Sequence, residues 1–210
     1  MIVVVGGHSR NIGKTAVAAG IIRLVPEARW TAVKITQHGH GVCAREGEEC
    51  ECAPSDPSHP YALTKETGPS SSDSGRFLAA GAANSYWLRT RAGELGHAMP
   101  VVRRILGEGE NTILESNSLL NFIQPDLYLP VLDFTVQDMK ESARRFLNRA
   151  SALVVSGELS SEPSWPGIPA RWLSAKQVFR VEPPDYESAA LAEFVRERIS
   201  RESRAHRPGG

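Results

Sequence analysis

The feature that most constrains this chain is a glycine-bounded loop near its N-terminus. Residues 1–6 read MIVVVG, an apolar run typical of a short buried strand, and residues 7–15 read GHSRNIGKT. The closing Gly-Lys-Thr opens a segment with helical apolar spacing. A strand, a loop and a helix in this order form a concave site for phosphate oxygens, because loop N–H groups and the helix N-terminus converge there. The order therefore predicts binding of a nucleoside triphosphate.

Three residues of the loop have distinct expected roles. Gly13 lets the backbone approach phosphate without a Cβ clash. Lys14 places a cation on the β and γ phosphates, and the Thr15 hydroxyl is a candidate Mg²⁺ ligand. The common spacing has four residues between its glycines and would need Gly at His8, whereas five follow Gly7 here. The expected nucleotide contacts are Gly7, His8, Ser9, Arg10, Asn11, Ile12, Gly13, Lys14, Thr15 and Ala16.

Length and charge narrow the class of protein. We expect the 210 residues to form one nucleotide-binding domain over 1–200 and a disordered tail over 201–210. The formal net charge is zero, so the chain has no excess of basic residues of the kind that nucleic-acid binding favours. No apolar stretch approaches the roughly 20 residues of a membrane span. The chain opens with a strand rather than a signal peptide, so we expect a cytoplasmic protein that binds no membrane.

Apolar strands alternate with amphipathic helices along most of the chain. Such alternation predicts an α/β fold with a mostly parallel sheet covered on both faces. Pro130 either weakens the expectation of a strand over 127–132 or places that strand near an edge, and Asp185 is a candidate N-cap for the last helix. Residues 37–74 are expected to form an irregular insertion. Expected strands are 2–6, 30–36, 85–88, 112–115, 127–132, 152–155 and 177–181, and expected helices are 14–24, 76–80, 95–106, 138–148 and 185–200.

Several short motifs resemble those of known nucleotide-binding proteins. The loop with five residues between its glycines resembles the dethiobiotin synthetase and cobyrinic acid amidotransferase group. Residues 33–40 (VKITQHGH), 73–76 (DSGR) and 80–82 (AGA) are similar to segments of the GTP-binding adaptor of molybdopterin guanine dinucleotide biosynthesis. The resemblance covers about residues 1–155 and implies the three-layer phosphate-loop NTPase fold. It also implies a homodimer, and for the adaptor a cofactor-biosynthesis enzyme as partner.

Three residues outside the loop are candidates for the chemistry. Glu115 ends a buried apolar strand, where a carboxylate is costly unless paired or metal-bound, so it is a candidate Mg²⁺ ligand beside Thr15; an N-cap for the following segment is the alternative. The resemblance implies a second acid after the second strand, for which Asp73 is the candidate; a turn role is the alternative. It also implies that Lys34 contacts substrate or the transferred phosphate. Lys14, Lys34 and Glu115 are therefore the expected catalytic residues.

All three cysteines fall within one short stretch of the irregular segment. Cys43, Cys50 and Cys52 lie near His38, His40 and His59. Three thiolates and one imidazole can form a tetrahedral zinc site, with His59 or one of the other two histidines as the fourth ligand. The spacing does not match a Cys-x-x-Cys ribbon, and free thiols in a loop are the alternative. Zinc is thus a candidate cofactor beside Mg²⁺ and the nucleotide.

These observations lead to one main hypothesis and two alternatives. The main hypothesis is Mg²⁺-dependent binding and hydrolysis of ATP or GTP, with a role as an adaptor in cofactor biosynthesis. The alternatives are an ATP-dependent ligase resembling dethiobiotin synthetase and a zinc- or redox-sensing regulator gated by nucleotide. Guanine selectivity usually follows an Asn/Thr-Lys-x-Asp motif after a late strand. Here residues 156–158 read SGE, so the base stays open.

Overall fold

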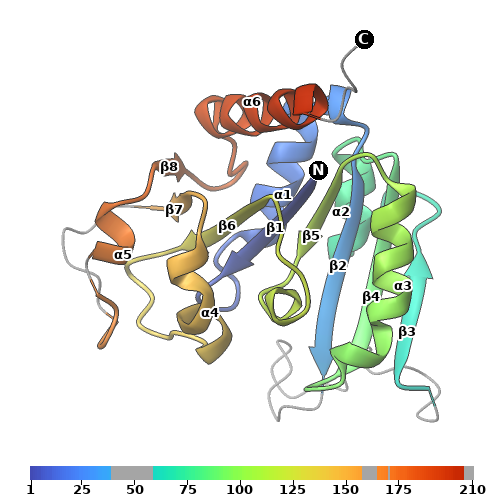
Figure 1. Cartoon of the computed structure of the whole chain (residues 1–210), viewed down its shortest axis with the longest axis horizontal. Coiled ribbons are helices and arrows are strands. Elements are labelled where there is room, and N and C mark those ends of the chain that lie inside the picture. The colour runs from blue at the N-terminus through green and yellow to red at the C-terminus, as the bar shows by residue number, and fades with distance from the viewer. Residues whose placement is uncertain (39–58, 158–164, 170, 206–210) are drawn as a thin grey trace.

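The computed structural model describes residues 1–38, 59–157, 165–169 and 171–205, which form one sheet with helices on both faces (Figure 1). The strands are β1 (Ile2–Gly7), β2 (Thr31–His38), β3 (Tyr61–Lys65), β4 (Asn84–Arg91), β5 (Thr112–Glu115), β6 (Leu127–Leu132), β7 (Leu153–Ser156) and β8 (Val178–Val181). The α-helices are α1 (Lys14–Leu24), α2 (Asp73–Ala79), α3 (Leu95–Glu108), α4 (Glu141–Phe146), α5 (Arg171–Ser174) and α6 (Ala189–Ala205). Short 3₁₀ turns are η1 (Pro26–Ala28), η2 (Ser118–Asn121) and η3 (Leu147–Arg149).

The sheet confirms the expected α/β class. Its strand order is β3-β4-β2-β5-β1-β6-β7-β8, and every neighbouring pair is parallel except β3 with β4. β1 lies between β5 and β6, with Val3 opposite Ile113 on one side and Leu127 on the other. The loop that follows β1 therefore opens near the middle of the sheet, at the carboxyl ends of the parallel strands. Ligands of such sheets bind at this edge.

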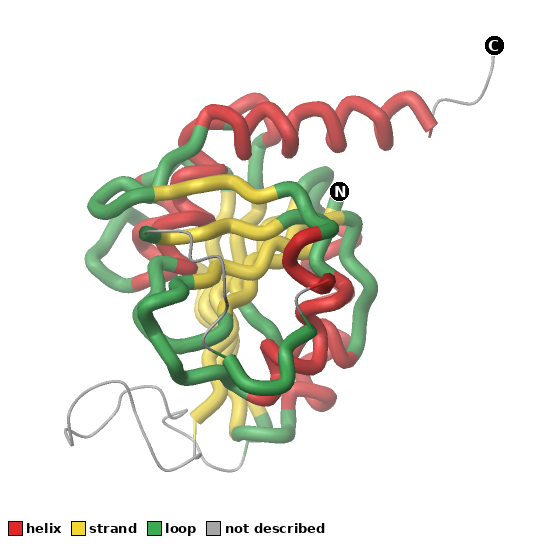
Figure 2. The backbone as a smooth tube through the Cα atoms, turned by 90° about the vertical axis from the view of Figure 1, so that its left-hand side faces the viewer, coloured by secondary structure: helices red, strands yellow, loops and turns green. Residues whose placement is uncertain are grey.

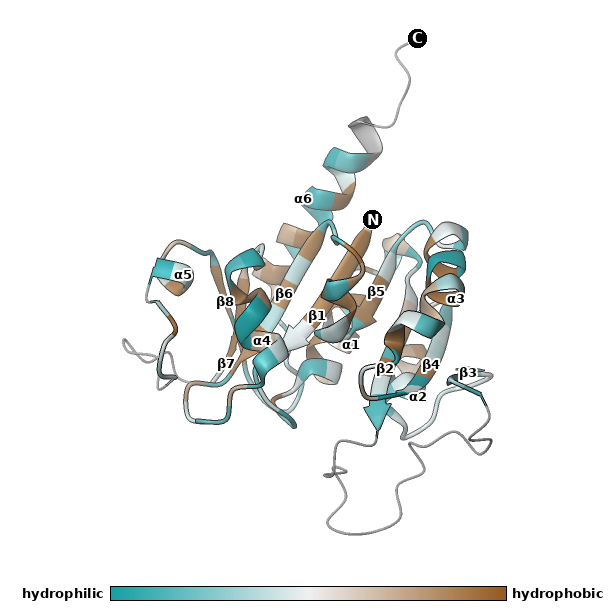
Figure 3. Cartoon of the chain, turned by 60° about the horizontal axis from the view of Figure 1, so that its bottom comes forward, coloured by the Kyte–Doolittle hydropathy of each residue, from teal (hydrophilic) through white to brown (hydrophobic). Residues whose placement is uncertain are grey.

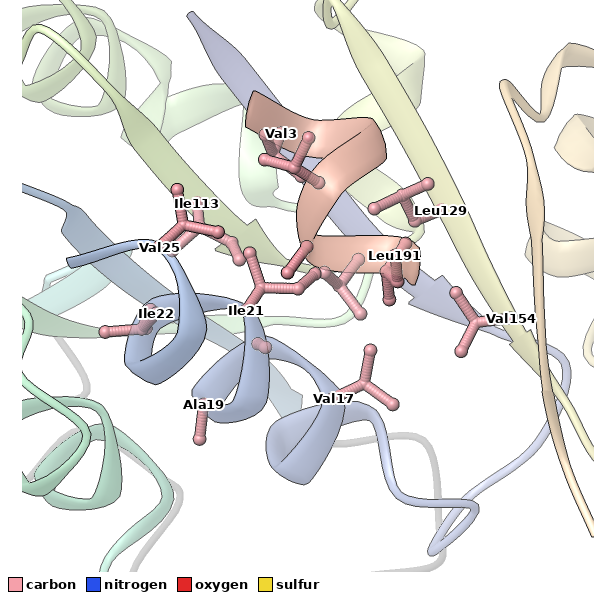
Figure 4. Packing of buried hydrophobic residues seen from close by; sticks show 14 of the residues in the cluster. Val3, Val17, Ala19, Ile21, Ile22, Val25, Ile113, Leu129, Val154 and Leu191 are labelled. Atoms are coloured by element: carbon pink, nitrogen blue, oxygen red, sulfur yellow. The ribbon is translucent and has the colours of Figure 1, made fainter. Parts of the chain in front are cut away.

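Two apolar cores sandwich the sheet. One joins α1, α2 and α6 to one sheet face, and Figure 4 shows Val17 and Ile21 of α1 close to Leu191 of α6. The other core joins α3, α4 and η2 to the opposite face. The central strands β1, β5, β6 and β7 are buried nearly throughout because both faces of the sheet are covered there, and much of β1 and β5 is brown in Figure 3. The C-terminal part of α6 extends beyond the body of the domain (Figure 2).

The irregular segment expected over 37–74 contains regular structure. β2 continues to His38, and Tyr61–Lys65 forms the edge strand β3, antiparallel to β4. The short run YALTK gives too little periodicity to predict a strand by itself, and pairing with β4 stabilises it. Residues 39–58, which include Cys43, Cys50, Cys52 and His40, lie outside the described residues.

Two expectations about the second half of the chain were wrong. Pro130 does not mark an edge, because β6 pairs with β1 on one side and β7 on the other; the β7 ladder begins at Val131, after the residue that lacks an N–H. Asp185 does not cap the last helix. Ser188 precedes α6, and its Oγ accepts a hydrogen bond from the N–H of Leu191 at 3.4 Å. α6 also continues to residue 205, into the segment expected to be a disordered tail.

None of the helices in the described part of the chain combines the length and apolar character that crossing a membrane would require.

Candidate functional site

The loop after β1 has the backbone of a phosphate site. Asn11 and Gly13 adopt left-handed conformations, with φ of 53° and 86°. A Cβ at Gly13 would collide with the ring of Tyr186, which packs against the loop from the β8–α6 connection. Within the described part of the chain, the N–H groups of residues 11–13 donate to no backbone carbonyl. Free N–H groups at a helix N-terminus are suited to phosphate oxygens.

The start of the loop is held by Asn117, a residue that the sequence did not single out. Its Oδ1 accepts from the N–H of Gly7 at 2.9 Å, and its Nδ2 donates to the carbonyl of Gly7 at 2.8 Å. A Cβ at Gly6 would collide with the Asn117 side chain, so glycine is required for this close approach. The segment after β5 thereby fixes the point where the chain leaves β1.

His8 joins the same loop to the segment between β6 and α4. Its Nε2 accepts from the N–H of Asp133 at 3.1 Å, and its Nδ1 donates to the carbonyl of Asp138 at 2.8 Å. These contacts select the neutral imidazole with its proton on Nδ1. Burial lowers the pKa of His8 and favours the same form. The Trp165 ring covers His8, at 4.5 Å between centroids. His8, expected to contact nucleotide, thus has a packing role as well.

Lys14 lies at the start of α1 and is partly buried. Its Nζ donates to the carbonyl of Ser9 at 2.7 Å, so the side chain folds back over the loop. Burial lowers the pKa of Lys14 to about 8, and the neighbouring charges of Lys140 and Lys34 act in the same direction. An ammonium held at this cost is stabilised by an incoming anion.

A second group of charged side chains lies beside Lys14. Thr15 Oγ1 donates to Glu115 Oε2 at 2.7 Å, and Lys34 Nζ lies 2.7 Å from Glu115 Oε1. Lys34 Nζ also lies 3.3 Å from Thr15 Oγ1 and 2.7 Å from Asp73 Oδ2. One ammonium therefore contacts three side-chain oxygens. Glu115 is 3% exposed in its side chain, whereas Asp73 is 46% exposed.

Charge pairing decides the ionisation of this cluster. Burial acts to lower the pKa of Lys34, but the Glu115 and Asp73 carboxylates outweigh it, and the pKa lies above its ordinary value. Burial acts to raise the pKa of Asp73, and Lys34 outweighs it in turn, so that pKa is lowered. Lys34 and Asp73 are therefore both charged at neutral pH. Its members come from α1, β2, α2 and β5, and the sheet brings them together at the carboxyl ends of the strands.

The donor set fits a magnesium ion. Mg²⁺ is bound through one or two carboxylates, a hydroxyl, substrate phosphates and water rather than by an all-protein cage. Thr15, Glu115 and Asp73 supply hard oxygens of this kind around one cation position. In the described part of the chain, no three His, Cys, Asp or Glu residues lie together in an arrangement that could hold a metal ion by themselves.

The structure assembles most of the residues singled out in the sequence. Lys14, Thr15, Lys34, Asp73 and Glu115 form one site. The cysteines proposed for zinc lie outside the described residues, and His59 lies before β3. Sequence reasoning missed Asn117 and Lys140. The Lys140 N–H donates to the His8 carbonyl at 2.8 Å, and its charge acts on Lys14 and Glu115. Asn117 follows β5 and Lys140 follows β6, and both strands end on the side of the sheet where the phosphate loop lies. This position after a strand was the sequence feature that could have identified them as site residues.

Comparison with known proteins supports the fold. Neither a protein-family model nor a curated protein sequence matches the chain. Among solved structures, HypB from Helicobacter pylori, determined in complex with nickel, matches with a TM-score of 0.50 and 10% sequence identity. The match covers 95% of this chain and 87% of the HypB chain. The architecture, with its loop between β1 and α1, is the phosphate-loop NTPase fold. At this level of identity the likeness concerns the fold alone.

Proposed function

We propose that this protein binds a nucleoside triphosphate together with Mg²⁺ and hydrolyses it or transfers its γ-phosphoryl group. The observation that carries the proposal is the convergence of Lys14, Thr15, Lys34 and Glu115 at the mouth of the loop. A chance Gly-Lys-Thr at a helix start would not bring a buried acid to the threonine and a second lysine to that acid. The absence of a guanine-selecting motif leaves ATP and GTP as equal candidates.

The residues have separate roles in the proposed mechanism. Loop N–H groups and Lys14 bind the β and γ phosphates and offset their charge. Thr15, Glu115 and Asp73 would hold the metal ion, which would supply Lewis-acid stabilisation of the transferring phosphoryl group when bound. Lys34 contacts the γ-phosphate or a second substrate from β2. The protein thus contributes positioning and charge, with little covalent chemistry.

Binding of MgATP and MgGTP by calorimetry tests this proposal. Lys14→Ala is expected to abolish tight binding of both while the fold survives, since Lys14 is not a core residue. Lys65→Ala is the matched control, because Lys65 lies on the edge strand β3 away from the loop. Glu115→Gln is expected to reduce Mg²⁺-dependent turnover far more than Mg²⁺-free nucleotide binding. Equal affinity of Lys14→Ala and wild type would refute the assignment.

A ligase resembling dethiobiotin synthetase is the second candidate. The position of the Lys34 ammonium, 2.7 Å from Glu115 beside the expected γ-phosphate, favours it, because a lysine there is able to contact a second substrate. The rate of nucleotide turnover distinguishes a ligase from an adaptor in cofactor biosynthesis. An adaptor hydrolyses nucleotide slowly without its partner, whereas a synthetase is stimulated by a small carboxylate or amine substrate.

Zinc bound by Cys43, Cys50, Cys52 and one histidine is a further element of the proposal. It is carried by the clustering of the cysteines in the sequence. Elemental analysis of protein purified without chelator should detect about one zinc per chain, as a single tetrahedral site requires.

A further inference from the structure

Lys34 lies where a metal ion bound by this site would lie. Its Nζ is 2.7 Å from Glu115 Oε1, 2.7 Å from Asp73 Oδ2 and 3.3 Å from Thr15 Oγ1. These are the three side chains proposed to hold Mg²⁺. Two cations cannot share the same lone pairs at these distances, and their mutual repulsion in a partly buried site is large.

We infer that the Lys34 ammonium acts as an internal counter-ion that occupies the metal position of the nucleotide-free protein and is exchanged for Mg²⁺ only when triphosphate binds. The inference rests on the proposed Mg²⁺–nucleotide site. Metal and nucleotide would then bind as a coupled pair, because Lys34 excludes the metal ion until phosphate oxygens are present to pair with the Lys34 ammonium.

The charges of the cluster support the exchange. Without ligand, one ammonium faces two carboxylates, so the buried Glu115 is paired and its burial is tolerated. A divalent ion added alone would have to expel Lys34 from both carboxylates with no anion to receive it. Triphosphate supplies that anion next to Thr15. The same phosphate without metal would face Glu115 and Asp73, so each ligand assists the other.

The test measures metal binding without nucleotide. Lys34→Met keeps the length and apolar stem of the side chain and removes the cation. Mn²⁺, followed by electron paramagnetic resonance, is the probe, and Mg²⁺ is the competitor. Nucleotide-free Lys34→Met is expected to bind Mn²⁺ about tenfold or more tightly than wild type, since a neighbouring like charge has been removed. Lys65→Met, on β3, makes the same substitution outside the site and should match wild type.

Thermal unfolding provides a second readout. Lys34→Met leaves Glu115 as a buried charge without its partner, which should lower the melting temperature. Mn²⁺ should restore much of that loss in Lys34→Met and have little effect on wild type. Glu115→Gln added to Lys34→Met should recover stability without metal and abolish the tighter Mn²⁺ binding. Equal Mn²⁺ affinity in wild type and Lys34→Met would overturn the inference.

A structure of the wild-type protein tests the exchange should Lys34→Met not fold. Bound to Mg²⁺ and a non-hydrolysable triphosphate, it should show Lys34 Nζ on a phosphate oxygen and the metal between Thr15 and Glu115. Lys34 still in contact with both carboxylates would refute the exchange. Failure of wild type to bind any nucleotide would refute the proposed function instead, and the Mn²⁺ comparison would still decide whether Lys34 excludes metal.

Discussion

At the scale of single residues, the site is organised by lysines in different electrostatic states. Lys34 is paired with two carboxylates, and its pKa is raised. The Lys14 ammonium contacts a carbonyl oxygen, and burial lowers its pKa to about 8. The first lysine stays charged throughout the physiological range. The second is close to losing its proton, and phosphate binding would hold that proton in place.

This difference predicts proton uptake on nucleotide binding. Triphosphate stabilises the charged form of Lys14, so its pKa rises in the complex. Above a pH of about 8 the free protein lacks the proton that the complex holds, so affinity should fall as pH rises and binding should take up a proton. Well below that pH, Lys14 is charged in both states and contributes no uptake.

Calorimetry in buffers of different ionisation enthalpy measures the uptake directly. Lys34 is not expected to contribute to this proton uptake, since its raised pKa keeps it charged over the same pH range. The lowered pKa of Lys14 also affects the stability of the nucleotide-free protein. Between about pH 8 and 10.5, Lys14 is protonated in the unfolded chain but largely deprotonated in the folded protein. Its contribution to the unfolding free energy should therefore rise with pH in that window. Affinity that stays constant across this range would contradict the assignment.

At the scale of elements, the loop depends on two segments that follow β5 and β6. Asn117 bonds both backbone groups of Gly7, and His8 bonds the segment between Asp133 and Asp138. Asn117→Ala should cost about 1–3 kcal/mol of unfolding free energy, because two backbone groups lose their partners. It should also weaken nucleotide binding by loosening the start of the loop.

Denaturant unfolding and calorimetry check this prediction. Asn121→Ala is the matched control, since Asn121 is exposed in η2, where its Nδ2 donates to the Ser118 carbonyl and its Oδ1 accepts from Arg145, both exposed contacts away from Gly7. Asn117→Ala with unchanged stability and affinity would show that the loop keeps its shape without the clamp.

The elements also show which parts of the molecule local sequence encodes. β5 was predicted over the residues it occupies, and the loop, Lys14 and Thr15 follow from a motif whose parts are adjacent in the chain. Strand β3 depends on β4, and the positions of Asn117 and His8 depend on contacts across most of the domain. Pro130 led to a wrong prediction of an edge strand because a missing N–H disrupts a strand only where a neighbouring strand would accept a hydrogen bond from it, and the pairing with β7 begins at Val131. Tertiary pairing decided each of these features.

At the scale of the whole molecule, we predict a homodimer that pairs across the nucleotide face. Asp73, at the start of α2, keeps its side chain 46% exposed although it contacts the buried Lys34. A partner pressed against this face would cover it. Light scattering at tens of micromolar protein, with and without nucleotide, measures the mass. A monomer under both conditions would contradict the prediction.

The packing of Tyr186 against Gly13 joins two residues that lie far apart in the sequence at the phosphate loop. During synthesis the loop leaves the ribosome before Tyr186 does, so the motif emerges well before the ring that completes its surroundings. Nucleotide stabilises the finished site, so it can stabilise a nascent chain in this way only after Tyr186 has been synthesised. Fragments truncated before β8 would carry the whole motif without the Tyr186 ring, and we expect them to bind nucleotide more weakly than the full chain.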